Sequence, residues 1–173
     1  MNQTAAASLA SASALTIARA DYRDPADAAA LVALLDAYAR DPMGGGEPLR
    51  ADVRQRLAPA LAQVPGAFSF LAREEEEPVG LINCFTGFST FAARPLVNVH
   101  DLVVLPGRRG KGLGRMLMAA AEREAMARGA CKLTLEVLAN NTKARALYAA
   151  LGYNGYALGP DAGSALFWEK KLP

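Results

Sequence analysis

Seven residues from Arg108 to Gly114, RRGKGLG, combine three glycines with three basic side chains. An apolar helical pattern, RMLMAAAEREAMA, begins directly after them. Glycine is costly in ordered structure unless its missing side chain is needed, and the first amide N–H groups of a helix have no acceptor within the helix. A loop of this kind is suited to bind an anion such as a phosphate, because the amides and the positive end of the helix dipole both face it.

Two common phosphate-binding patterns do not fit this loop. The P-loop pattern requires Ser or Thr directly after the lysine, but Lys111 is followed by Gly112, so no hydroxyl is available for magnesium. The dinucleotide-binding pattern requires a third glycine where this chain has Leu117. Without further evidence, the glycines could equally serve only to allow a tight turn.

The composition predicts one soluble domain. The chain has 173 residues, of which 52% are apolar and 21% charged, and its net charge of +2 is too small for a typical nucleic-acid-binding domain. A single histidine excludes a His-rich metal site, and Cys84 and Cys131 are expected to be free thiols, so no metal is predicted. No apolar run reaches the ~18 residues of a membrane span. We expect a cytoplasmic protein in which residues 1–14 form a disordered tail.

The remaining chain reads as alternating strands and helices. Asp24 and Pro25 are typical helix-start residues, Gly129 is a typical helix stop, and Pro59 is expected to strain or break the second helix. A C-terminal hairpin is expected to close the sheet. The predicted strands are 14–20, 67–73, 79–88, 96–106, 131–138, 156–159 and 164–172, and the predicted helices are 24–41, 50–64, 115–129 and 140–153.

A second motif accompanies the glycine loop. The pattern Arg109-x-x-Gly112-x-Gly114 follows a strand, and the helix after it leads to another strand, as a parallel crossover requires. Asn141 and Tyr148 then fall around the next helix, in LEVLANNTKARALYAALGY. In these features the sequence resembles the GNAT family of N-acetyltransferases, whose hallmark is R/Q-x-x-G-x-G/A after the fourth strand with an Asn and a Tyr around the following helix.

The resemblance covers residues 16–172 in element order, and its specific motifs lie within 97–153. It implies a single-domain α/β fold over residues 15–173. That fold has a mixed central sheet of about six to seven strands, is flanked by about four helices, and splays between its fourth and fifth strands.

The resemblance also implies that acetyl-CoA is the cofactor. Its pantetheine arm would pair with the strand backbone in the splay, as a ligand that extends a sheet edge, and Asn141 would hold the arm or the adjacent loop. The pyrophosphate would lie on the amides of the glycine loop. The residues that would bind acetyl-CoA are therefore Leu102, Val103, Val104, Arg109, Gly110, Lys111, Gly112, Leu113, Gly114, Arg115 and Asn141.

Acetyl transfer from a thioester to an amine needs an acid that protonates the departing thiolate. Tyr148 matches the family position for that acid, and its ordinary pKa of ~10 keeps it protonated near neutral pH. Glu136 stands twelve residues before Tyr148. This spacing resembles that of the base and the acid in ribosomal-protein N-terminal acetyltransferases. Alternatively, Tyr148 only packs its helix and Glu136 is a surface carboxylate.

The amine must also lose its proton before it can attack. His100 and Glu136 are the candidate bases, with Asp101 third. His100 occupies the position that a glutamate fills in polyamine acetyltransferases of the family, and imidazole is a competent base. On a regular strand His100 shares a face with Leu102 and Val104, opposite Asp101. Alternatively, His100 is a hydrogen-bonded core histidine.

The sequence therefore predicts an N-acetyltransferase that moves an acetyl group from acetyl-CoA to a primary amine, on a small molecule or a peptide, by direct transfer in a ternary complex. One alternative is a non-catalytic acyl-CoA sensor with the same fold, although a sensor does not need Tyr148. Another is a nucleic-acid-binding protein, although the chain lacks an extended basic face. Homodimers are common in the family, but no residue in this sequence specifies an interface.

Overall fold

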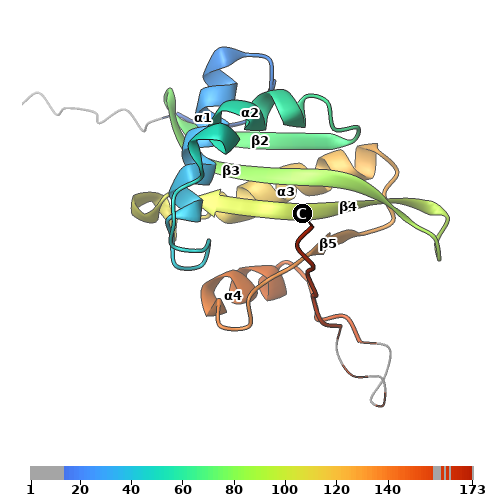
Figure 1. Cartoon of the computed structure of the whole chain (residues 1–173). Helices are drawn as coiled ribbons and strands as arrows, with labels where there is room; N and C mark the ends of the chain where they lie inside the picture. Colours follow the sequence, from blue (N-terminus) through green and yellow to red (C-terminus); the bar gives the residue numbers. More distant parts are fainter. Residues whose placement is uncertain (1–13, 158–160, 162, 164, 173) are drawn as a thin grey trace, which may run out of the picture.

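The computed structural model describes residues 14–157, 161, 163 and 165–172, so nearly all of the predicted N-terminal tail lies outside the described residues. The elements follow one another along the chain as Figure 1 shows. They are β1 (Leu15–Arg19), α1 (Pro25–Ala39), α2 (Ala51–Leu61), β2 (Ala67–Glu74), β3 (Glu77–Ser89), β4 (Arg94–Val104), the 3₁₀ turn η1 (Pro106–Arg108), α3 (Leu113–Ala127), β5 (Leu133–Leu135) and α4 (Thr142–Ala150).

The five strands form one mixed sheet in the order β1-β2-β3-β4-β5. The first four strands pair antiparallel as successive neighbours, whereas β4 and β5 are parallel and are joined through α3. Strand β4 pairs with β3 along its whole length but with β5 only over residues 97–99. Beyond that point β4 continues as an open edge, as the predicted splay requires.

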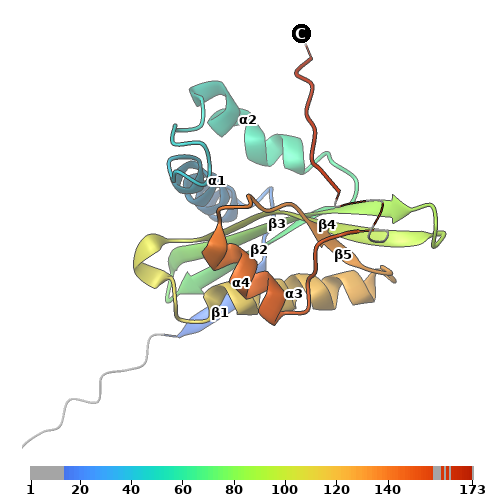
Figure 2. The ribbon, with the colours of Figure 1, turned by 90° about the horizontal axis from the view of Figure 1, so that it is seen from below.

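Helices cover both faces of this sheet (Figure 2). The face under α3 is centred on Phe68, Ile82 and Leu117, and α4 packs against the same cluster through Tyr148. The opposite face, under α1 and α2, includes Leu31 and Leu34, both almost fully buried. Full burial of each such side chain contributes about 1.5–3 kcal/mol, so the two apolar layers hold the helices against the sheet.

Local signals explain where the helices begin and end. The Asp24 carboxylate caps α1 by accepting from the amides of Ala26 and Asp27, and Pro25 occupies the first helical position. Gly129, with φ of 70°, follows the end of α3. Of the two predicted effects of Pro59, strain or a break, the break is absent, because α2 continues through Pro59 to Leu61. The proline lies in the last turn, where it removes one amide donor and only two helical residues follow it.

The strand count is the main difference from the predicted sheet of six to seven strands. The predicted strand 131–138 shortens to the three residues of β5, because β4 diverges from it after Val99. Among the described residues, the predicted C-terminal hairpin is limited to a single bridge residue, Ala157, and the amide of Ala165 donates to Tyr156 O at 3.0 Å. Trp168, expected in the core or a pocket wall, is 83% exposed. Its segment has the apolar content of a strand but pairs with no strand among the described residues.

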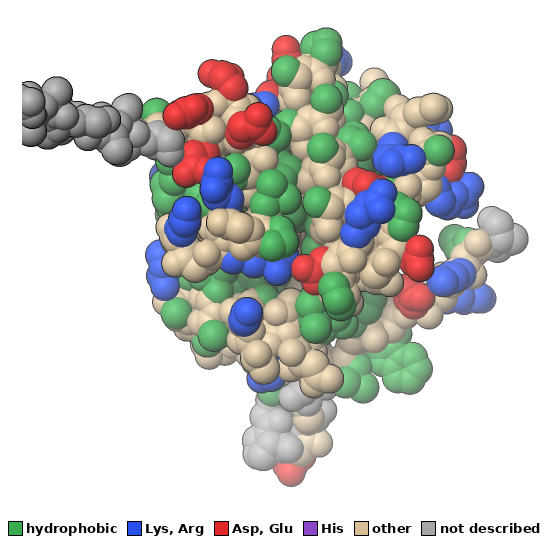
Figure 3. Space-filling model, turned by 90° about the vertical axis from the view of Figure 1, so that its left-hand side faces the viewer, with side chains coloured by type: hydrophobic (Ala, Val, Ile, Leu, Met, Phe, Trp, Pro, Cys, Tyr) green, Lys and Arg blue, Asp and Glu red, His purple; other side chains and the backbone are tan. Residues whose placement is uncertain are grey.

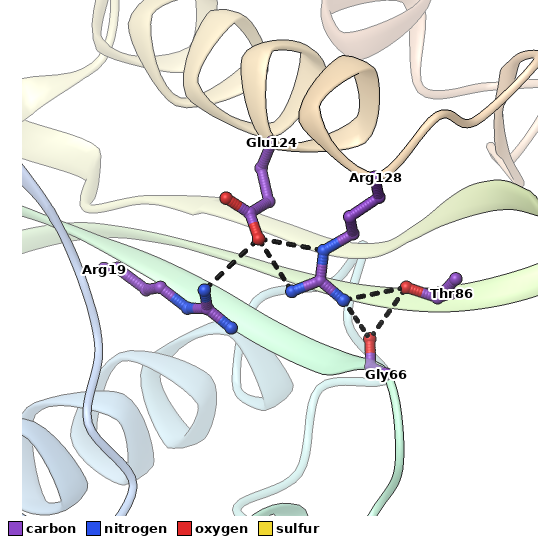
Figure 4. Close-up of polar contacts among 5 residues, drawn as sticks. All are labelled: Arg19, Gly66, Thr86, Glu124 and Arg128. Atoms are coloured by element: carbon purple, nitrogen blue, oxygen red, sulfur yellow. Dashed lines mark hydrogen bonds and ion pairs between the residues drawn. The ribbon is translucent and has the colours of Figure 1, made fainter.

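Arg128 joins the end of α3 to the sheet (Figure 4). Its guanidinium binds the Glu124 carboxylate at 2.7 Å, and its Nη1 donates to Thr86 Oγ1 at 3.0 Å and to Gly66 O at 3.4 Å. The guanidinium carbon also lies 4.3 Å from the centre of the Phe68 ring. Arg128 therefore ties α3 to both β2 and β3.

Replacement of this arginine tests its contribution to stability. We expect Arg128→Ala to lower the free energy of unfolding by about 1–3 kcal/mol, because it removes the ion pair with Glu124, the hydrogen bond to Thr86 and the contact with the Phe68 ring together. Chemical denaturation measures the change. Arg123→Ala is the matched control, since Arg123 is exposed on the same helix, and it should stay within about 0.5 kcal/mol of the parent. Equal effects of the two substitutions would contradict the assigned role.

Candidate active site

The glycine loop leads into α3 with its backbone exposed. Gly110 and Gly112 have φ of 80° and 83°, a region that side chains disfavour, and a Cβ added at either would meet no atom within 4 Å. The first helical bond runs from Met116 N to Gly112 O, so the amides before Met116 have no helical acceptor. Figure 3 looks onto this end of the molecule and shows basic side chains spread over it. The loop therefore presents free amide donors to an open space.

At Gly114 glycine is required for a different reason than at Gly110 and Gly112. A Cβ at this position would lie 3.0 Å from Leu147 Cδ2 on α4. The missing side chain at Gly114 lets α4 approach the first turn of α3, so this glycine brings the tyrosine-bearing helix close to the loop.

The two arginines that open the loop are bound to carboxylates. Arg108 pairs with Glu74 at 2.5 Å. Arg109 binds Asp41 at 2.9 Å through Nη2 and donates from Nε to Val104 O at 2.9 Å. Backbone and side-chain hydrogen bonds, with Arg109 among the donors, hold the pKa of the Asp41 carboxyl below its usual value. Both arginines thus anchor the loop to neighbouring elements.

Strand β4 presents part of its backbone to the splay. Leu105 N donates to Val79 O, so the polar backbone groups of Leu105 and, by alternation, of Val103 point toward β3. Those of Leu102 and Val104 point toward the open edge, in agreement with the bond from Arg109 to Val104 O. Of the three predicted strand residues, two can offer backbone groups to a ligand in the splay, and Val103 supports them from the β3 side.

A β-bulge interrupts β4 next to this edge. Asn83 of β3 lies opposite Asp101, but the next residue, Cys84, lies opposite Val99. His100 is therefore the extra residue of the bulge. An inserted residue shifts the alternation of side chains along the strand, so residues before and after it change faces.

The bulge contradicts the predicted orientation of His100. Leu102 and Val104 pack in the cluster on the α3 side. The His100 ring instead meets Phe85, which belongs to the cluster on the α1 side, edge-to-face at 5.4 Å. Asp101 lies on that side too, so His100 and Asp101 share a face rather than opposing each other. A sequence-based strand assumes strict alternation, and the bulge breaks it.

Tyr148 projects from α4 into the apolar cluster beside the splay. Its ring centre lies 6.0 Å from that of Tyr153. Burial raises the pKa of Tyr148 to about 12, and Tyr38 at the end of α1 adds a smaller upward electrostatic effect. Burial also raises the pKa of Tyr38, and the charges of Asp101 and Asp41 raise it further. Tyr148 is thus protonated at neutral pH, and Tyr38 lies within electrostatic range of both Tyr148 and Asp101.

The other two predicted residues have specific partners. Asn141 caps α4, because its Oδ1 accepts from Ala144 N at 3.2 Å. Glu136 is exposed just beyond β5, where its carboxylate accepts from Asn98 Nδ2 at 3.2 Å. No contact joins Glu136 to Tyr148, although their spacing in the sequence suggested a common site.

The sequence analysis missed several polar residues at this site. Tyr38 and Asp41 stand at the end of a helix before the glycine-rich segment PMGGGEP, which was a readable sign of a loop near a pocket. Asn98 and Asn83, polar residues inside strand patterns, were the other available signal. Their partners are distant in the sequence, so their roles could not be read from it.

Comparison with known proteins identifies the family. Residues 28–153 match the sequence profile described as the acetyltransferase (GNAT) family. The chain belongs to the GNAT family. This confirms the resemblance seen in the glycine loop and in α4.

Relatives and solved structures agree with the GNAT assignment. The uncharacterised N-acetyltransferase YhfO of Bacillus subtilis (strain 168) is 37% identical over 83 residues, a match that covers 48% of this chain and 56% of YhfO. The chain thus spans about half the length of this curated relative. Among solved structures, the ribosomal-protein-alanine N-acetyltransferase of Brucella melitensis biovar Abortus 2308 is 24% identical to this chain, with a TM-score of 0.65. The match covers 90% of this chain and 100% of that chain.

A second similar solved structure is an aminoglycoside N-acetyltransferase in complex with CoA. It is 19% identical, has a TM-score of 0.69, and covers 92% of this chain and 96% of that chain. At this identity the likeness shows a common fold. Within the described part of the GNAT chain, no helix is long and apolar enough to cross a membrane.

The raised pKa of Tyr148 can be measured directly. Its value of about 12 lies above the 10.0 of an exposed tyrosine, so the unfolded chain loses this proton first. Stability from this group is complete below pH ~10 and is lost as pH rises toward the folded pKa. We expect Tyr148→Phe to remove part of the high-pH phenolate absorbance step. Tyr156→Phe, which removes an exposed phenol, should leave that step intact, and a reversed pattern would contradict the burial argument.

Proposed function

We propose that this GNAT protein transfers an acetyl group from acetyl-CoA to a primary amine on a small molecule or a peptide, by direct transfer in a ternary complex. The observation that carries the proposal is the combination of three features: the open amide cradle before α3, the edge of β4 that β5 leaves unpaired, and the half-buried, protonated Tyr148 of α4. We also propose a cytoplasmic location.

The glycine loop fits a pyrophosphate. The free amides of residues 110–115 would donate to its oxygens, and Lys111 and Arg115, both exposed, would add positive charge. In our proposal Arg109 holds the glycine loop in its shape and does not bind the pyrophosphate itself, because its guanidinium already binds Asp41 and Val104 O. The backbone groups of Leu102 and Val104 would pair with the pantetheine amides, and Asn141 would support this region as the cap of α4.

The chain's own residues supply the proton transfers of this reaction. Tyr148 would protonate the departing thiolate, and a β4 backbone N–H would stabilise the charge on the carbonyl oxygen. Three groups on the α1 side, His100, Glu136 and Asp101, could take the proton of the incoming ammonium. Acetyl-CoA supplies the activated acyl group when bound.

A non-catalytic acyl-CoA sensor is the alternative. Release of free thiol from acetyl-CoA with a panel of amines separates the two functions. Turnover with any amine supports the enzyme, whereas binding of acetyl-CoA without turnover on every amine supports the sensor.

The cradle predicts that acetyl-CoA stabilises the protein. At about 100 times its dissociation constant the ligand should add ~2.7 kcal/mol to the unfolding free energy. Gly112→Val should abolish most of the resulting thermal shift, because its side chain enters the ligand space and disturbs the loop. Gly129→Val is the matched control, since Gly129 has φ of +70° and lies at the other end of α3. It should strain the chain but keep the ligand shift, and loss of the shift in both variants would argue against the cradle.

The acid role of Tyr148 predicts a split between binding and turnover. Tyr148→Phe should lower kcat by about 10²–10⁴-fold, because its hydroxyl acts as the thiolate leaves. The affinity for acetyl-CoA, measured by calorimetry, should change little. Tyr153→Phe is the control, since the Tyr153 ring packs beside that of Tyr148. A wild-type rate for Tyr148→Phe, with chemistry rate-limiting, would leave Tyr148 as a packing residue.

A further inference from the structure

A chain of polar side chains crosses the sheet beneath α1. Ser69 of β2 and Asn83 of β3 are 0% and 3% exposed, respectively, and they stand in an otherwise apolar layer. Tyr22 OH lies 2.8 Å from Ser69 Oγ, Ser69 Oγ lies 2.6 Å from Asn83 Oδ1, and Asn83 Nδ2 lies 3.0 Å from Asp101 Oδ2. Burial of a polar group costs free energy unless the group finds a hydrogen-bond partner, so this row of buried polar side chains calls for a functional explanation.

The proton of each hydrogen bond can be assigned. Asn83 donates to Asp101 from its Nδ2, which places its Oδ1 toward Ser69. The hydroxyl of Ser69 has one proton and donates it to that oxygen. Tyr22 must therefore donate to Ser69 Oγ. All three donors point toward Asp101, so this row of hydrogen bonds fixes the position of its carboxylate.

Asp101 lies on the α1 side of the sheet, next to the bulge of β4. It follows the bulge residue of β4 and shares the α1 side of the sheet with Tyr38 and His100. The titratable groups around it are Tyr38 from α1, Cys84 from β3 and His100 beside it in β4. Tyr38 is also within electrostatic range of Tyr148. Asp101 thus lies on the α1 side of the sheet, and Tyr148 packs in the cluster on the α3 side.

The two competing bases are held less firmly. The His100 side chain is exposed, and its ring contact is with Phe85. Glu136 is also exposed and accepts only long bonds, 3.2 and 3.4 Å, from Asn98. Asp101 is half-buried, and a row of three oriented donors behind it fixes its position.

We propose that Asp101 takes the proton of the acceptor ammonium, and that Ser69 and Asn83 are positioning residues that hold its carboxylate toward the amine. This inference rests on the proposed N-acetyltransferase function and names its base. The single bond from Asn83 engages Oδ2 of Asp101, which leaves Oδ1 to accept from the substrate.

The proton balance of the reaction is complete with these groups. One ammonium proton passes to Asp101, and the neutral amine nitrogen forms a bond with the thioester carbonyl carbon. The carbon–sulfur bond then breaks, the thiolate takes the Tyr148 proton, and the second nitrogen proton restores Tyr148. Asp101 releases its proton to solvent, so the products are an amide, CoA thiol and one proton.

The first test compares two acceptors with Asp101→Asn. One is the best primary amine from the panel, which is protonated at neutral pH, and the other is its β,β,β-trifluorinated analogue, which is largely unprotonated at neutral pH because the fluorines lower the pKa of its ammonium. The variant should lose about 10²-fold or more in kcat with the first amine, and much less with the second. The KM for acetyl-CoA should not change. Asp52→Asn, the same chemical change at an exposed ion pair of α2, should match the wild type with both amines.

The second test is a double-mutant cycle between Asp101 and Ser69. Ser69→Ala alone should lower kcat by about tenfold or more, because the carboxylate loses its fixed orientation. In the Asp101→Asn background, Ser69→Ala should have no further effect on kcat, because it acts through Asp101. Ser89→Ala removes another buried serine hydroxyl, in β3. Ser89 is not part of the row of hydrogen bonds from Tyr22 to Asp101, so this substitution should leave kcat unchanged. If Ser69→Ala does not fold, Tyr22→Phe replaces it in the cycle.

Four outcomes would overturn the proposal. The first is equal loss with both amines for Asp101→Asn, which would indicate a structural defect. The second is wild-type turnover for Asp101→Asn together with a loss for His100→Gln or Glu136→Gln, which would move the base to that residue. The third is additivity in the cycle, which would make Ser69 a stability residue. In each of these the wild type still transfers acetyl groups, so the proposed function survives. Failure of the wild type with every amine overturns both.

Discussion

The separation of β4 from β5 is the constraint on which the other features of this molecule depend. The two strands pair over residues 97–99 only, while β3 holds β4 along its full length. A parallel neighbour that stopped later would cover the backbone of Leu102 and Val104. Because β5 ends early, those polar groups face an opening. The glycine loop and α4 approach each other at Gly114.

The chain stabilises this opening from outside rather than by filling it. Arg109 connects the loop after β4 to the end of α1, and Arg128 connects the far end of α3 to β2 and β3. Each guanidinium offers several donors in a fixed plane and so joins two or more elements at once. The missing side chain of Gly114 lets α4 come close enough for Tyr148 to reach the α3-side cluster. These contacts around the splay hold it open, although the splay has no hydrophobic core of its own.

Most of the fold could be predicted from the sequence, because the strong local patterns correspond to helices and strands that the structure contains. The Asp24–Pro25 cap, the helix between Gly112 and Gly129, and the β2–β3 pair were all found. Features that depend on distant partners were not predictable. The bulge at His100 exists only relative to β3, and the end of β5 is set by the course of β4. For this reason the loop and Tyr148 could be read from motifs, whereas the side to which His100 points could not.

The segment between α1 and α2 is attached at both ends by two carboxylates, Asp36 of α1 and Asp41 just after it. Asp36 accepts from the amide of Leu49 at 2.8 Å, and Asp41, which binds Arg109, accepts from the amide of Met43 at 2.9 Å. The residues between these two clamps contribute little to either apolar layer. Residues 45–48 can therefore diverge in length between relatives, or be replaced by an engineer, while the scaffold and the anion loop keep their geometry. Gly44 cannot be exchanged in this way, because a Cβ there would collide with the carbonyl oxygen of Tyr38.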